Sequence, residues 1–119
     1  MATILIIDDS VTVAKVFQGF LTRAGHQVGV AGDGASGLAA ARAVPPDLVL
    51  LDFVLPDMNG TEICTQLKND PQFKSPRVIL LTGSHNEQVA QAGADLYLTK
   101  DCGPGRVLQA VRELLVEAR

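Results

Sequence analysis

The stretch "ILIIDDS" at residues 4–10 joins four apolar side chains directly to two adjacent carboxylates, Asp8 and Asp9. An uninterrupted apolar run of this length is typical of a strand that is buried on both faces, as in a parallel sheet. Asp is also a good N-cap residue, so either acid could begin the next helix, although Ser10 competes for that position. The pair alone therefore leaves helix capping and cation binding open.

Short apolar runs alternate with stretches of helical spacing along the whole chain. The apolar runs cover residues 3–7, 27–31, 47–51, 77–81 and 96–99. The first helical stretch has an apolar stripe through Val13, Phe17, Phe20, Leu21 and Ala24; the others lie at 34–43, 60–69, 85–92 and from Pro104 onward. This repeated βα order predicts an α/β fold, in which a parallel sheet carries helices on both faces and the crossovers are right-handed.

Length and composition limit the classes of function. The 119 residues fit one domain spanning 1–119, and 47% of them are hydrophobic, which is enough for a core. The net charge of −3 provides no basic field, so we expect no direct nucleic acid partner and no membrane partner. No apolar run approaches the length of about 20 residues that a membrane span needs. Cys64 and Cys102 are typical of reduced thiols, which favours a cytoplasmic protein.

Polar side chains follow most of the predicted strands, at the edge where parallel sheets bind their ligands. Asp8 and Asp9 follow the first strand, Asp52 the third, Thr82 the fourth and Lys100 the fifth. If the strand order is 2-1-3-4-5, the first and third strands are neighbours and three carboxylates converge. Clustered carboxylates repel one another unless a cation intervenes, and Mg²⁺ prefers oxygen ligands of this kind. The sequence therefore predicts a magnesium site.

Thr82 and Lys100 each have a less specific interpretation. Thr82 could cap the next helix, but "SHNE" at 84–87 already forms a capping box there, so we assign Thr82 to the site. Lys100 alone would be an ordinary surface lysine with its charge in water. Beside three acids at a strand end, it is instead a cation that can neutralise the charge of a bound anion.

Taken together, "IIDDS", "VLLDFVLPDMNG", "ILLTG" and "LYLTK" resemble the receiver domain of response regulators in two-component signalling systems, of the chemotaxis-regulator type. The resemblance covers essentially the whole chain. It implies a flavodoxin-like fold with five parallel strands in the order 2-1-3-4-5. It also implies a phosphoryl group taken from a sensor histidine kinase or a phosphotransfer protein, and a surface that switches its binding to an unknown downstream protein target.

The resemblance further implies roles for individual residues. Asp52 is the implied phosphorylation site, and the implied Mg²⁺ ligands are Asp8, Asp9, Asp52 and the backbone carbonyl of Val54. Thr82 and Lys100 would contact the phosphoryl oxygens, and Thr82 would act together with Tyr97 as the switch. Such a domain assists only its own phosphoryl transfer and dephosphorylation and is otherwise not an enzyme.

Two segments depart from the pattern of that family. Asp101 follows Lys100 where the family usually has Pro, which leaves Lys100 less fixed and predicts slow phosphorylation. The segment after Thr82 is about one helical turn shorter than in most receivers, which predicts a short fourth helix. A receiver-like interaction module that does not switch therefore stays open. A small Mg²⁺-dependent phosphohydrolase is disfavoured, because Val54, two residues after Asp52, cannot protonate a leaving group.

The stretch "GDGASG" at 32–37 matches the glycine-rich motif of dinucleotide-binding proteins and lies between a predicted strand and a predicted helix. Asp33 would place negative charge against a bound pyrophosphate, and the motif falls in the second βα unit rather than the first. A nucleotide site would also leave Asp8, Asp9 and Lys100 unexplained. We therefore interpret these glycines as turn and helix-packing residues.

Overall fold

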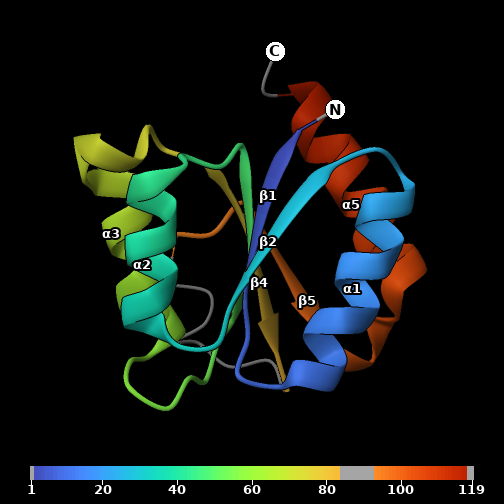
Figure 1. The fold of residues 1–119 in the computed structure, drawn as a ribbon, viewed down its shortest axis with the longest axis horizontal. Coiled ribbons are helices and arrows are strands. Elements are labelled where there is room, and N and C mark those ends of the chain that lie inside the picture. The colour runs from blue at the N-terminus through green and yellow to red at the C-terminus, as the bar shows by residue number, and fades with distance from the viewer. Residues whose placement is uncertain (1, 84–92, 118–119) are drawn as a thin grey trace.

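Five parallel strands form one sheet in the order β2-β1-β3-β4-β5 in the computed structural model, which describes residues 2–83 and 93–117 (Figure 1). The strands are β1 (Thr3–Ile7), β2 (Gln27–Ala31), β3 (Leu48–Asp52), β4 (Arg77–Thr82) and β5 (Leu96–Thr99). Because β1 pairs with both β2 and β3, the strand order reverses at β1, and the ends of β1 and β3 are neighbours. The predicted sheet order is confirmed.

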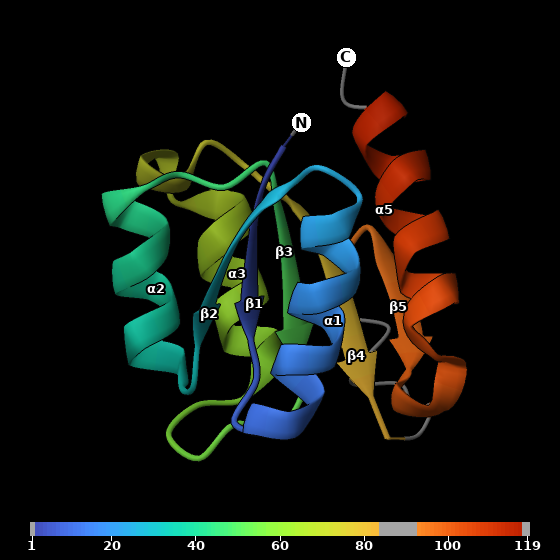
Figure 2. The same cartoon turned by 45° about the vertical axis from the view of Figure 1, so that its right-hand side comes forward.

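Helices cover both faces of this sheet, as predicted. Helices α1 (Val11–Arg23) and α5 (Pro104–Glu117) lie on one face, and α2 (Gly34–Ala43) and α3 (Gly60–Asn69) lie on the other (Figures 1 and 2). Alternate side chains of β1 divide between the two cores: Ile4 and Ile6 pack with α1 and α5, whereas Leu5 and Ile7 pack with α2 and α3. Burial on both faces explains why this strand is apolar from Ile4 to Ile7.

The first helix begins at the residue that competes with the acid pair for its cap. The Ser10 hydroxyl accepts a hydrogen bond from the Val13 N–H at 3.3 Å, which is the N-cap arrangement. Gly25, with φ of +98°, follows the C-terminal end of α1. Because Ser10 caps the helix, Asp8 and Asp9 are available for another purpose.

The apolar stripe expected along α1 is partly wrong. The side chains of α1 that are buried are those of Ala14, Phe17 and Leu21, whereas Phe20 is 39% exposed. Instead, the guanidinium carbon of Arg23 lies over the Phe20 ring, 5.8 Å from the ring centroid. Ala14 satisfies the same helical spacing as Phe20, and the smaller side chain fits where α1 lies against the sheet.

Two strands end one residue later than the apolar pattern predicts, and β3 also begins one residue later, at Leu48. Asp52 is the last residue of β3 and Thr82 the last of β4, and both are only 2% exposed. The predicted helix 85–92 and its capping box lie outside the described residues. Two short 3-10 helices complete the described chain, η1 (Pro71–Phe73) and η2 (Lys100–Cys102). Among the described residues, no helix is long and apolar enough to cross a membrane.

Candidate functional site

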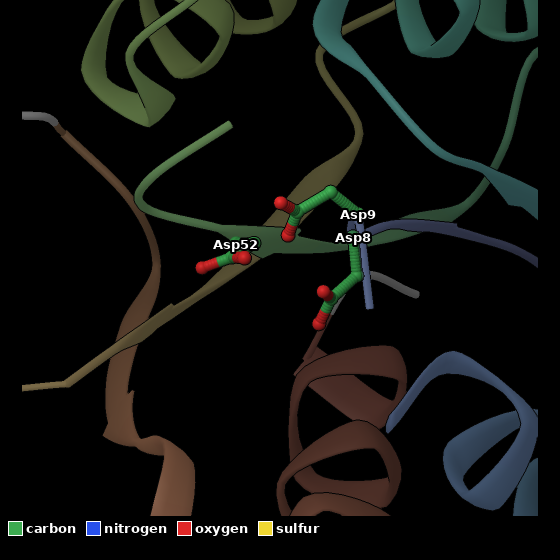
Figure 3. Close-up of side chains that lie close together, drawn as sticks. All are labelled: Asp8, Asp9 and Asp52. Carbon is green, nitrogen blue, oxygen red and sulfur yellow. The ribbon is translucent and has the colours of Figure 1, made fainter. Parts of the chain in front are cut away.

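Three carboxylates meet at the carboxyl end of the sheet. Asp8, Asp9 and Asp52 each offer an oxygen that lies within 4.8 Å of an oxygen of the other two (Figure 3). The topology causes this, because Asp8 directly follows β1, Asp52 ends β3, and Ile7 of β1 is in register with Leu51 of β3. The structure therefore brings together the three acids that the sequence analysis placed at one site.

Asp8 is a buried acid with one carboxylate oxygen that lacks a hydrogen-bond partner in the described part of the chain. It is 2% exposed, and its Oδ1 accepts a hydrogen bond from the Ser10 N–H at 2.9 Å. Its Oδ2 is buried and has no hydrogen-bond partner within the described part of the chain. A buried carboxylate oxygen without a partner is costly, and a hard divalent cation satisfies such an oxygen directly. The donor set at this edge therefore fits Mg²⁺.

Lys100 is the cation that faces this acid cluster. It begins η2, immediately after β5, and its Nζ lies 2.9 Å from Oδ2 of Asp52. The other oxygen of Asp52, Oδ1, accepts a long hydrogen bond of 3.4 Å from the Val54 N–H. Asp52 therefore has one oxygen that accepts a hydrogen bond from the Lys100 ammonium and one that accepts only a weak hydrogen bond.

In the pair formed by Asp52 and Lys100, burial affects the pKa of Asp52 more than the attraction to Lys100 does. Burial raises the pKa of Asp52, and the negative charge of Asp8 raises it further, although the hydrogen bond from Lys100 opposes both. Burial alone would lower the pKa of Lys100, but the hydrogen bond to Asp52 and the nearby acids raise it overall. Lys100 therefore stays charged, while the ionised form of Asp52 depends on nearby positive charge.

Asp101, the residue that departs from the family pattern, contacts Thr99, the last residue of β5. The Thr99 hydroxyl donates a hydrogen bond of 2.5 Å to Oδ1 of Asp101. The contact between Lys100 and Asp52 forms with Asp101 in this position. The slow phosphorylation expected from Asp101 stays a prediction.

Thr82 is the last residue of β4 and Tyr97 lies on β5, the two strands that follow β3 in the sheet. Thr82 is in register with Thr99, the residue before Lys100, so it belongs to the same edge as Asp52. The Tyr97 ring is half-buried against the core between the sheet and α2 and α3, and its hydroxyl accepts a hydrogen bond from the Ala94 N–H at 3.2 Å. Their roles as switch residues stay predictions.

The loop that follows Asp52 is closed tightly at its base. Val54 and Asn59 pair as an isolated antiparallel bridge, and the Gly60 N–H donates to the Phe53 carbonyl at 2.7 Å. Gly60 needs to be a glycine, because a Cβ there would lie 2.8 Å from the carbonyl oxygen of Asp52. The loop therefore folds back on the strand end and leaves the Val54 side chain 68% exposed.

Three backbone N–H groups of the glycine-rich motif at 32–37 donate hydrogen bonds to carboxylates of the protein itself. The carboxylate of Asp57 accepts hydrogen bonds from the N–H groups of Gly34 and Ala35, at 2.7 and 2.9 Å, and Asp33 accepts one from Ser36 at 2.7 Å. A Cβ at Gly37 would lie 2.5 Å from the Ile7 side chain, so this glycine serves close packing. Asp57 was not predicted from the sequence, because its partners are backbone N–H groups and no residue type marks them.

The sequence matches the family described as "Response regulator receiver domain" over residues 4–112. The chain belongs to this receiver family. Receiver domains are signalling modules of two-component systems, and they interact with histidine kinases and with downstream targets.

Curated relatives of this receiver domain differ in length. It is 37% identical to the protein PilH of Pseudomonas aeruginosa, over 97% of this chain and 98% of PilH. It is 36% identical to the DNA-binding response regulator MtrA of Mycobacterium tuberculosis, over 94% of this chain but 50% of MtrA. The receiver domain therefore spans nearly all of PilH and about half of MtrA.

Solved structures agree on the fold of this receiver domain. The chemotaxis response regulator CheY4 of Vibrio cholerae matches with a TM-score of 0.88 and 27% identity, over 96% of this chain and 98% of CheY4. A signal receiver domain of a histidine kinase from Syntrophus aciditrophicus matches with a TM-score of 0.92 and 29% identity, over 100% and 93% of the two chains.

Proposed function

We propose that this receiver domain accepts a phosphoryl group on Asp52, with Mg²⁺, from a phosphohistidine of a sensor histidine kinase or a phosphotransfer protein. The observation that supports this most directly is the contact between Asp52 and Lys100, 2.9 Å long, beside two further acids. One of those acids, Asp8, has a buried oxygen without a hydrogen-bond partner in the described chain.

The magnesium ligands in this proposal are Asp8, Asp9, Asp52 and the backbone carbonyl of Val54. When bound, Mg²⁺ supplies positive charge that offsets the negative charge of the phosphoryl oxygens during transfer. The exposure of Asp9 suits a site that keeps several water ligands, as Mg²⁺ sites usually do.

The chain's own residues then act on the transferred group. A carboxylate oxygen of Asp52 forms a new P–O bond as the P–N bond of the donor breaks, and the departing imidazole takes up a proton. Lys100 exchanges its contact with Asp52 for one with a phosphoryl oxygen, which keeps the developing charge neutralised. Thr82, at the end of the neighbouring strand, contacts a second phosphoryl oxygen.

The output in this proposal is a change of binding surface. Movement of Thr82 toward the phosphoryl group draws the Tyr97 ring further into the space beside it, which alters the surface offered to a downstream protein. The whole chain, 1–119, acts as one cytoplasmic receiver domain, and its only chemistry is its own phosphorylation and dephosphorylation.

The test is incubation with a small acyl phosphate and Mg²⁺, followed by intact mass measurement. The wild type should gain one stable phosphoryl group, and Asp52→Asn should gain none. Asp47→Asn is the matched control, because Asp47 lies at the opposite end of β3, where its Oδ2 accepts a hydrogen bond from the Thr3 N–H. Asp47→Asn should be phosphorylated like the wild type.

Two other results would overturn the proposal. No modification of the wild type would identify a receiver-like interaction module that does not switch. Repeated turnover of the acyl phosphate, with phosphate release far above one equivalent per chain, would identify a small Mg²⁺-dependent phosphohydrolase.

A further inference from the structure

The loop between β3 and α3 is attached to the rest of the molecule at its tip as well as at its base. The base is closed by the bridge between Val54 and Asn59, which involves only the loop itself. At the tip, Asp57 reaches across to the first turn of α2, a helix 23 residues earlier in the chain. This tip contact ties the loop that carries Val54 to a separate element.

The tip contact fixes both the position and the orientation of the loop. Each oxygen of the Asp57 carboxylate accepts one backbone hydrogen bond, from Gly34 at 2.7 Å and from Ala35 at 2.9 Å. Paired hydrogen bonds to a charged group are strong and directional, and the helix N-terminus adds attraction for negative charge. Met58 packs so closely that a Cβ at Gly34 would lie 2.7 Å from its sulfur.

Helix α2 also supports the other side of the acid cluster. Gly37, in the same first turns of α2, packs against Ile7, since a Cβ at Gly37 would lie 2.5 Å from the Ile7 side chain. Ile7 directly precedes Asp8, so the position of Asp8 depends on the same helix. One rigid element therefore sets the separation between Asp8 and the loop that carries Val54.

We propose that Asp57 is a positioning residue for magnesium binding, which acts by holding the Val54 carbonyl at a fixed place relative to Asp8. This inference rests on the proposed function, because it takes Asp8 and Val54 as magnesium ligands. Without Asp57 the base of the loop still closes and Met58 still packs on α2, but the tip loses the two hydrogen bonds that orient it. Binding must then order the loop, and that cost reduces the affinity for Mg²⁺.

The test is the dissociation constant of Mg²⁺, measured by isothermal titration calorimetry on the full chain. Asp57→Ala should weaken binding by about threefold or more. Asp57→Asn keeps one acceptor oxygen and should fall between Asp57→Ala and the wild type. Asp33→Ala is the matched control, because it removes one negative charge and one hydrogen bond from the same helix end but does not touch the loop. Its dissociation constant should stay within about twofold of the wild type.

Amide hydrogen exchange in metal-free protein provides a second readout. Exchange within residues 53–59 should be faster in Asp57→Ala than in Asp33→Ala. If the wild type binds Mg²⁺ and Asp57→Ala binds it equally well, the positioning role is overturned and the metal site stands. If Asp57→Ala and Asp33→Ala lose the same Mg²⁺ affinity, the cause is loss of charge and hydrogen bonding at the start of α2. That result would also overturn the positioning role. A wild type that binds no Mg²⁺ overturns the metal site itself.

Discussion

Nζ of Lys100 lies 2.9 Å from Oδ2 of Asp52, although 48 positions separate the two residues in the chain. The aspartate side chain is 2% exposed and the lysine side chain 37% exposed, so the pair lies at the boundary between the core and solvent. An anion that arrives from solvent can therefore meet the ammonium without entering the core. This geometry predicts that removal of the Lys100 ammonium slows phosphoryl transfer to Asp52.

Lys100→Met should slow phosphorylation by a small acyl phosphate about 100-fold, because a preorganised positive group at the developing charge is lost. The rate is measured from the phosphorylated fraction in intact mass spectra over time. Lys15→Met is the control: Lys15 lines a groove with Asp8 and Asp9, so one positive charge near the acids disappears while Asp52 keeps its partner. If both variants react at the wild-type rate, Lys100 has no role in the transfer.

Asp8→Asn should raise the free energy of unfolding in metal-free buffer and strongly reduce the stabilisation by Mg²⁺. The change removes one of three clustered charges and should add about 1 kcal/mol to the free energy of unfolding. Mg²⁺ at ten times its dissociation constant should stabilise the wild type by about 1.4 kcal/mol and the variant by far less. Denaturant unfolding with and without chelator measures both quantities. Equal stabilisation of the two proteins would place the ion elsewhere.

Asp95→Asn should destabilise the domain in a pH-dependent way. Asp95 accepts hydrogen bonds from Lys68, from Nη1 of Arg77 at 3.1 Å and from the Val78 N–H at 2.8 Å. Burial alone would raise the pKa of Asp95, but these contacts outweigh it and hold the pKa below its usual range. A lowered pKa in the folded state stabilises the protein above the ordinary aspartate pKa, and this contribution is lost as the pH falls through the folded-state pKa.

The loss of unfolding free energy in Asp95→Asn should therefore be about 1–3 kcal/mol at pH 7. It should begin to shrink below about pH 4, where Asp95 takes up a proton in the unfolded chain, and it should vanish once the pH is below the lowered pKa of the folded state. Denaturant unfolding at both pH values measures the difference. If Asp95→Asn loses the same unfolding free energy at pH 7 and below pH 4, the negative charge of Asp95 is not the cause of the loss.

Gly60→Ala should destabilise the domain by about 1–3 kcal/mol, because the new methyl group would overlap the backbone at Asp52 and Phe53. Gly19→Ala is the matched control, since no atom lies within 4 Å of a Cβ added at that position in α1. It should stabilise the protein by about 0.5–1 kcal/mol through the helix preference of Ala. Thermal or denaturant unfolding distinguishes the two, and a Gly60→Ala protein as stable as Gly19→Ala would show that the loop can relax.

Val54→Asn should shorten the lifetime of the phosphorylated form. The Val54 side chain is 68% exposed and apolar, so it offers no polar group to orient an attacking water, whereas an amide does. Loss of the phosphoryl group is followed by intact mass after the donor is removed. Val44→Asn, an exposed valine at the end of α2, should match the wild type. Identical lifetimes for wild type and Val54→Asn would contradict this expectation.

The three central strands, β1, β3 and β4, were predictable because they are buried on both faces, whereas the edge strands β2 and β5 are partly exposed. All five residues of β3 are buried, and no amphipathic alternation competes with that pattern. The buried face of α1 was less predictable, since a spacing of 3.6 residues accommodates either Phe20 or Ala14 in the stripe. The packing of α1 against the sheet, which local sequence does not contain, selects Ala14.

The acid cluster was predictable for a topological reason. Parallel strands end at a common edge, so residues at the carboxyl ends of β1 and β3 must approach each other once the strand order is known. Asp57 was not predictable, because its partners are backbone N–H groups 22 and 23 residues away, and the path of the loop alone brings them within reach. Backbone partners of this kind carry no residue type that a sequence motif could record.

The carboxylate of Asp57 also decides what else this domain can bind. A helix N-terminus after a glycine-rich turn ordinarily attracts phosphate groups. Here an outside anion would have to displace a carboxylate tethered to the same chain, at an effective concentration on the order of millimolar or higher. The Asp57 carboxylate thus occupies the backbone N–H groups of the second βα turn that a nucleotide phosphate would need, and the proposed phosphoryl site lies at the neighbouring strand ends.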